Sequence, residues 1–163
     1  MTDLDAAAGV DHSRVLDAAA ARGLEVELRP RPNVRSLEEA AAAFGILPTD
    51  IVKTLVVKRS DDTYLFALVP GGRKISWPKL RAVVGVNKLK LPEADAALAA
   101  TGYERGTIVP IGSTTDWPVF ADASIVGRRI AMGSGSHGFG LFIDADALIA
   151  AYGATVADIS EPE

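Results

Sequence analysis

The stretch "DIVKTLVVKR", Asp50–Arg59, decides the fold, because it is a short apolar run with a charge inside it. Its branched apolar residues favour a strand that is buried on both faces. Side chains alternate between the two faces of a strand, so Lys53 shares a face with Leu55 and Val57. The sequence therefore predicts an ammonium group on a face that is otherwise suited to a core.

Regular elements are predicted on both sides of this stretch, and they form no internal repeat. Residues 51–58 and 63–70 are two apolar runs around the polar "RSDD", which is typical of an antiparallel hairpin. Helical patterns occupy 11–23, 36–45, 76–85, 92–102 and 145–153, and further strand patterns occupy 24–29, 123–127, 128–133 and 141–144. Hairpins interspersed with helices predict an α+β fold on a mixed, mostly antiparallel sheet flanked by helices.

Length and composition indicate one domain. The chain has 163 residues, of which 48% are hydrophobic, so it can bury one sizeable core, and we expect a single domain over residues 1–163. It has no run of about 18 apolar residues, and "MTDLDAAAGV" lacks the basic start and apolar stretch of a signal peptide. We therefore expect a cytoplasmic protein that has no membrane partner.

The residue inventory excludes several kinds of chemistry. There is no cysteine, which excludes disulfides, thiolate nucleophiles and zinc–thiolate sites, and His12 and His137 alone cannot build a transition-metal site. We expect neither a metal nor a cofactor. The net charge of −4 argues against broad binding to DNA or RNA but leaves room for a local basic patch. Arg29, Arg31 and Arg35 in "RPRPNVR" are candidates for contacts with phosphates.

Four segments resemble, in order and spacing, the YbaK/prolyl-tRNA editing domain family. They are "DIVKTLVVK", the hairpin with "ALVPGG", "TGYERGTIVPIG", and the glycine-rich "GSGSHGFG" with the strand and helix that follow it. The resemblance covers about 36–153. Family members are freestanding aminoacyl-tRNA deacylases and the editing insertions of bacterial prolyl-tRNA synthetases. The resemblance therefore implies a barrel-like sheet and hydrolysis of the ester of a mischarged tRNA.

The resemblance also implies roles for particular residues. Lys53 stands where the family has the lysine of its editing pocket, and "GTIVP" stands where it has a G-x-x-x-P element whose backbone lines the aminoacyl end. "GSGSHG" stands where a glycine-rich loop closes the other side of the pocket. With Lys53 as the catalytic residue, the implied substrate-binding residues are Gly106, Thr107, Ile108, Pro110, Gly133, Ser134, Gly135, Ser136 and His137.

The implied partner is the 3′ terminal adenosine of an aminoacyl-tRNA with its ester. The resemblance favours a tRNA(Pro) that carries alanine or cysteine as the substrate, and a prolyl-tRNA synthetase as a second partner. It implies attack by a water molecule that the substrate's own ribose hydroxyl assists, without a covalent enzyme intermediate.

Each of these features also has a plainly structural interpretation. A lysine at a strand end can extend its ammonium group to water, "GTIVP" can be an ordinary turn, and "GSGSHG" can be a hairpin connection. His137 can alternatively act as a general base, because histidine titrates near neutral pH. The alternative function is a noncatalytic module that holds an RNA end or a synthetase.

Overall fold

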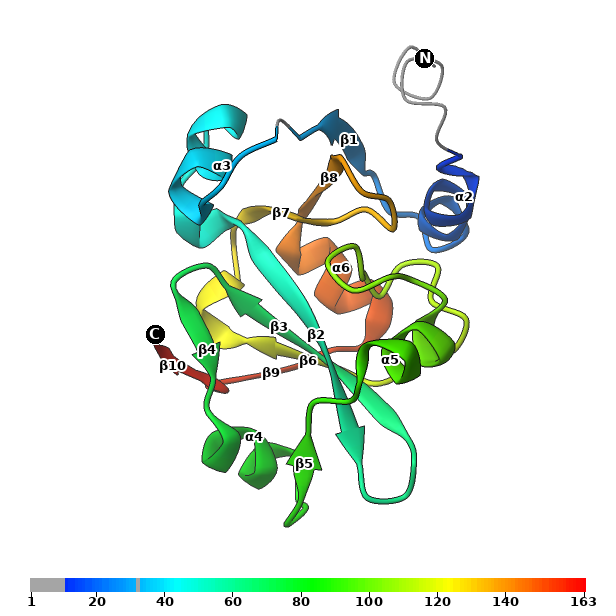
Figure 1. Ribbon diagram of the computed structural model, residues 1–163, viewed down its shortest axis with the longest axis vertical. Helices are drawn as coiled ribbons and strands as arrows, with labels where there is room; N and C mark the ends of the chain where they lie inside the picture. The colour runs from blue at the N-terminus through cyan, green and yellow to red at the C-terminus, as the bar shows by residue number, and fades with distance from the viewer. Residues whose placement is uncertain (1–10, 32) are drawn as a thin grey trace.

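The computed structural model describes residues 11–31 and 33–163 (Figure 1). Its helices are α2 (Ser13–Ala21), α3 (Leu37–Phe44), α4 (Trp77–Val84), α5 (Ala94–Thr101) and α6 (Ala145–Tyr152), with 3₁₀ turns η1 (Pro48–Asp50) and η2 (Ala123–Ile125). Its strands are β1 (Glu27–Pro30), β2 (Val52–Arg59), β3 (Tyr64–Pro70), β4 (Arg73–Ile75), β5 (Leu89–Lys90), β6 (Val119–Asp122), β7 (Arg129–Gly133), β8 (Phe139–Asp144), β9 (Thr155–Ala157) and β10 (Ser160–Pro162). The prediction that 1–10 carry no signal peptide falls outside the described residues.

Two helices begin and end at caps that the sequence provides. The Ser36 hydroxyl accepts a hydrogen bond from the Glu39 N–H at 3.0 Å at the start of α3, and Gly45 ends this helix with a φ of 71°. Ser76 and Gly85 cap α4 in the same way. Both predicted helices are confirmed. They could be predicted because the residues that start and end them lie within the same short segment of sequence.

The strands pair in three sheets that are mixed and mostly antiparallel. The strand orders are β5-β2-β3-β6-β9, β1-β8-β7 and β10-β4. β2 and β3 form the predicted hairpin, in which Lys53 lies opposite Val69, while β6 pairs in parallel with β3 and with β9. The α+β class is therefore confirmed. The barrel-like sheet is not, because the sheets of the described residues remain separate apart from one bridge between Ile51 and Ala131.

One predicted strand is wrong, and several short strands escape the sequence patterns. Residues 123–127 were expected to form a strand, but the Asp122 carboxylate accepts the Ser124 N–H at 3.2 Å and starts the 3₁₀ turn η2 there. The strand of this region is β6, which ends where that turn begins. Strands β4, β5, β9 and β10 have only two or three residues each, too few to show a period of two.

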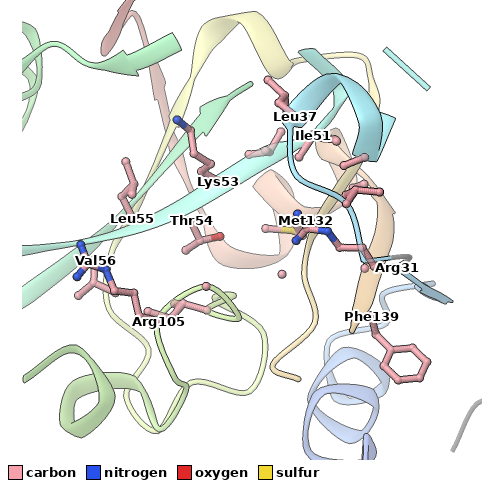
Figure 2. Close-up of a pocket in the computed structure, with 18 of the residues that line it drawn as sticks. Arg31, Leu37, Ile51, Lys53, Thr54, Leu55, Val56, Arg105, Met132 and Phe139 are labelled. Carbon is pink, nitrogen blue, oxygen red and sulfur yellow. The ribbon is translucent and has the colours of Figure 1, made fainter. Parts of the chain in front are cut away.

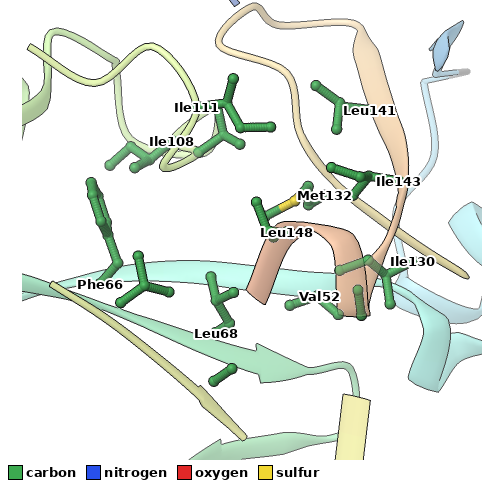
Figure 3. Packing of buried hydrophobic residues seen from close by; sticks show 14 of the residues in the cluster. Val52, Phe66, Leu68, Ile108, Ile111, Ile130, Met132, Leu141, Ile143 and Leu148 are labelled. Atoms are coloured by element: carbon green, nitrogen blue, oxygen red, sulfur yellow. The ribbon is translucent and has the colours of Figure 1, made fainter. Parts of the chain in front are cut away.

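The central sheet is covered on both faces, as its apolar strands predict. Along β3, Phe66 and Leu68 belong to one buried cluster, whereas the alternate residues Leu65 and Val69 belong to another. Figure 3 shows the first cluster, in which side chains of β2 and β3 pack against β7, β8 and α6. In the described chain no helix is long and apolar enough to span a membrane.

Candidate functional site

A cavity of about 500 Å³ opens along one edge of β2 (Figure 2). Its size falls in the range of small-ligand sites. β2 pairs with β3 along its other edge, but on this edge only Lys58 and Arg59 pair with β5 and only Ile51 bridges to β7. The edge between these two points therefore has no strand partner in the described structure. As a result the cavity is lined by six consecutive residues from both faces of the strand, Ile51, Val52, Lys53, Thr54, Leu55 and Val56.

Lys53 lines this cavity close to the beginning of β2, where its side chain is 42% exposed. Its Nζ donates to the Arg73 carbonyl oxygen at 3.1 Å and lies 3.4 Å from Glu163 Oε2. An ammonium group at a strand end that reaches water avoids the desolvation cost of a buried lysine. Two interpretations of Lys53 were open, a side chain that extends to water and a residue of the pocket. Both fit the structure, because the side chain is partly exposed and Lys53 is one of the residues that line the cavity.

Thr54 is a site residue that the sequence did not indicate. Figure 2 shows it on the opposite face of β2 from Lys53, as alternation along a strand requires. Its Oγ1 is buried and has no hydrogen-bond partner among the described residues. A buried hydroxyl without a partner costs about 1–3 kcal/mol, so this oxygen lowers the stability of the folded protein.

The two predicted walls of the pocket, "GTIVP" and "GSGSHG", lie against each other. The Gly135 N–H donates to the Thr107 carbonyl oxygen at 2.8 Å. Gly133 permits this approach, because a Cβ atom at that position would lie 2.5 Å from the Ile108 carbonyl oxygen. Gly106 is different, since it has a φ of 91° and nothing lies within 4 Å of where its Cβ would be. Its missing side chain leaves the backbone open.

The Gly106 loop is anchored from behind by a tyrosine and an arginine. The Tyr103 hydroxyl donates to the Ile111 carbonyl oxygen at 2.7 Å, and burial raises the pKa of this tyrosine. The Arg14 guanidinium lies 4.3 Å from the centre of the Tyr103 ring and donates to the Gly112 and Thr101 carbonyl oxygens at 2.6 and 2.8 Å. These contacts tie α2 to the loop and restrict its motion.

Of the residues predicted for the site, four line the cavity. They are Lys53, Gly106, Ile108 and Gly133. The other predicted residues do not belong to the lining of the described cavity, namely Thr107, Pro110, Ser134, Gly135, Ser136 and His137.

Some of those six residues hold the walls of the cavity in place. The Ser134 hydroxyl, for example, donates to the Ser136 and Phe139 carbonyl oxygens at 2.9 and 3.0 Å and so holds the turn between β7 and β8. The hairpin interpretation of "GSGSHG" is confirmed. The side chain of His137 is 68% exposed, with Nε2 4.0 Å from Glu104 Oε2.

The charge around the cavity is of one sign. Arg31, Arg35 and Arg105 line it together with Lys53, and no aspartate or glutamate is among the described lining residues. Arg29, the third candidate in "RPRPNVR", has a structural contact instead: its guanidinium lies 4.6 Å from the centre of the Phe142 ring and donates to the Phe44 carbonyl oxygen. A cationic rim over an apolar wall suits a ligand that has an anionic part and an apolar part.

The donor set does not suggest a metal centre. No three histidine, aspartate or glutamate side chains of the described residues come close enough together to hold an ion. The polar side chains that line the cavity include Lys53, Thr54 and three arginines, Arg31, Arg35 and Arg105.

The chain belongs to the aminoacyl-tRNA editing domain family, because the sequence pattern of that family matches residues 31–151. This match spans the cavity from Arg31 through Lys53, Gly106 and Gly140. The sequence resemblance to editing domains is confirmed.

Similar proteins include bacterial proline–tRNA ligases. The ligase of Thermosipho africanus is 38% identical over 82 residues, which are 50% of this chain and 14% of the ligase. That of Shouchella clausii is 35% identical over 120 residues, which are 73% of this chain and 21% of the ligase. The chain thus corresponds to a small part of these ligases.

Solved structures of similar length share the fold. The crystal structure of a candidate trans-editing enzyme for prolyl tRNA synthetase has a TM-score of 0.84 and 27% identity, and the match covers 92% of this chain and 96% of that one. A hypothetical protein of known structure has a TM-score of 0.82 and 28% identity, with 91% and 99% covered.

Proposed function

We propose that this protein is an aminoacyl-tRNA deacylase that acts in trans on a mischarged tRNA. The observation that carries the proposal is the cavity itself, which Lys53 and Gly106 line together with three arginines. The proposed substrate is a tRNA(Pro) that carries alanine or cysteine, and a prolyl-tRNA synthetase is the proposed second partner. Such a substrate is made in the cytoplasm, which is the proposed site of action.

The cationic rim would bind the phosphate of the terminal adenosine. Arg31, Arg35, Arg105 and Lys53 supply this charge without a competing carboxylate in the described lining. The interaction of Lys53 with Glu163 is exposed at both ends, so a phosphate can replace that carboxylate at small cost. Phosphate binding would position the ester above the open edge of β2.

The reaction is a hydrolysis. The oxygen of a water molecule attacks the ester carbonyl carbon, negative charge develops on the carbonyl oxygen, the bond to the ribose oxygen breaks, and that oxygen leaves with a proton. The family resemblance implies that the ribose hydroxyl of the substrate assists the water. Lys53 would stabilise the negative charge or the phosphate, and backbone N–H groups near Gly106 would orient the carbonyl.

The apolar wall would hold the amino-acid side chain. Small and apolar residues of α3, β2 and β7 supply this wall, among them Ala40, Val52 and Met132. One methylene in such a pocket changes selectivity by about 1–3 kcal/mol. The adenosine would occupy part of the cavity, and the space left beside it would favour an ester with a small amino-acid side chain.

A deacylation screen tests the proposal. Purified protein is mixed with tRNAs that carry radiolabelled alanine, cysteine, serine or proline, and loss of the ester is followed against a protein-free control. We expect faster hydrolysis of alanyl- or cysteinyl-tRNA(Pro) than of correctly charged prolyl-tRNA(Pro). A noncatalytic RNA-end or synthetase-binding module would instead protect or ignore every ester.

A further inference from the structure

A second cavity, of about 510 Å³, lies at the far end of β2 from Lys53. Five cations line it, namely Lys58, Arg59, Arg81, Lys88 and Lys90, against one carboxylate, Asp62. We infer that this cavity, which we call the β5 cavity, binds the phosphodiester backbone of the RNA whose aminoacylated end occupies the first cavity. The inference rests on the proposed function.

The charges of the chain are strongly segregated toward the two cavities. The chain has 17 lysines and arginines and 21 aspartates and glutamates, and its net charge is −4. Nine of the 17 cations line one cavity or the other, whereas one acidic side chain does so among the described residues. A protein that is acidic overall but basic at two concave sites attracts a polyanion to those sites.

The two cavities border the same edge of β2. β5 pairs with β2 through Lys90 opposite Lys58, and the next residues, Leu91 and Pro92, line the first cavity. Figure 1 shows β2 running from the region of α3 to the region of β5. Lys58 lies five steps along the strand from Lys53, or about 17 Å at 3.3–3.4 Å per residue. That is several nucleotide steps, since each step advances about 3.4 Å along a duplex.

Most of the cations of the β5 cavity are available for a ligand. Lys58 forms an ion pair with Asp62 at 3.1 Å, but no ion pair or side-chain hydrogen bond joins Lys88 or Lys90 to another described residue. Lys58 and Lys90 face each other across two strands, where like charges repel. A bound phosphate relieves that repulsion. Glu93 and Asp95, which follow Pro92, line neither cavity.

The experiment compares a double variant, Lys88→Gln with Lys90→Gln, with the unchanged protein on two substrates. One substrate is a full-length alanyl-tRNA(Pro), and the other is the alanyl ester of adenosine, which is too short to reach the β5 cavity. We expect kcat/KM on the tRNA to fall roughly tenfold, and its logarithmic salt dependence to weaken by about 0.7–0.9 for each lysine removed. Hydrolysis of the adenosine ester should not change.

A second double variant, Lys74→Gln with Lys79→Gln, is the matched control. It makes the same change in net charge at two exposed lysines that line neither cavity, and it should behave like the unchanged protein. Equal losses for both double variants, or an equal loss on both substrates, would overturn the inference.

Binding to uncharged tRNA keeps the two proposals apart. If the unchanged protein hydrolyses neither substrate, the proposed function fails, and fluorescence anisotropy with labelled uncharged tRNA still tests the β5 cavity. Weaker binding by the Lys88/Lys90 double variant than by the Lys74/Lys79 control then supports the cavity as an RNA site. Identical affinities, or no binding by the unchanged protein, reject it.

Discussion

Replacing Lys53 with alanine should separate catalysis from stability. In the folded protein the ammonium group binds one carbonyl oxygen and one carboxylate, both in a partly exposed position. Exposed ion pairs contribute about 0–1 kcal/mol to the free energy of unfolding. For a chain of this size the melting temperature should therefore fall by no more than about 2–4 °C.

The effect on hydrolysis should be much larger. Removal of one preorganised electrostatic contact to a transition state slows a reaction by about 100- to 1000-fold. The ammonium group of Lys53 is 42% exposed, so water screens part of its field and the lower end of this range applies. We expect about a 100-fold decrease in kcat/KM for the preferred ester, which corresponds to about 2.7 kcal/mol.

Lys79 offers a matched control for this variant. Its side chain is 43% exposed, its Nζ lies 2.9 Å from Asp158 Oδ2 and 3.0 Å from the Ser160 carbonyl oxygen, and it does not line either cavity. Lys79→Ala thus removes the same kind of contacts at the same exposure. Deacylation rates and thermal unfolding are measured for both variants. A folded Lys53→Ala protein as active as Lys79→Ala would refute the assignment of Lys53.

The remaining predictions concern other groups of the site and the fold. Thr54→Val should raise the melting temperature, because it removes an unpaired buried hydroxyl, and it should leave deacylation close to that of the unchanged protein; a lower melting temperature in thermal unfolding would contradict this. His137→Ala should change the order in which an ester panel is cleaved, with little change in affinity for uncharged tRNA, and a preserved order would remove His137 from amino-acid selection. Deacylation should survive exhaustive chelation with correctly folded tRNA, and recovery on one added ion after complete loss would show a metal-dependent reaction. Asp122 has a pKa below its ordinary 3.8, since burial raises that pKa but hydrogen bonds from Ser124, Ser160 and Ile159 lower it more. The carboxylate therefore stabilises the fold above about pH 4 and loses this effect as pH falls through the folded pKa, so the difference in melting temperature between the unchanged protein and Asp122→Asn should narrow in acid.

Features that short segments encode could be predicted from the sequence. The caps of α3 need only Ser36, Glu39 and Gly45, and the hairpin of β2 and β3 needs two apolar runs with a polar turn. The residues "ASIVG" look like a short strand, but the N–H and the hydroxyl of Ser124 both donate to the Asp122 carboxylate, and a hydrophobic pattern does not encode these hydrogen bonds. The very short strands exist only because a partner strand lies beside them.

The residues of the site likewise fall into two groups, those that a local sequence motif indicates and those that depend on contacts with distant segments. Lys53 and Gly106 belong to ordered motifs, so the sequence could bring them to one pocket. Thr54 could not be recognised, because a threonine in a strand is ordinary and its hydroxyl is unusual only in lacking partners that would come from distant segments. Arg105 had a usable signal, namely a cation directly before the glycine of "GTIVP".

The open edge of β2 connects the fold to the proposed chemistry. Uncovered strand edges expose backbone N–H and C=O groups and invite unwanted pairing, so proteins usually cover them or place charges there. In the described structure β5 covers only Lys58 and Arg59, although two more pairs in the same register would place Leu91 and Pro92 beside β2. Proline has no N–H to donate and cannot extend the ladder, so Pro92 ends the coverage. The charge of Lys53 then lies beside an edge that has no strand partner in the described structure, and the backbone groups of this edge remain free to meet a substrate in the cavity.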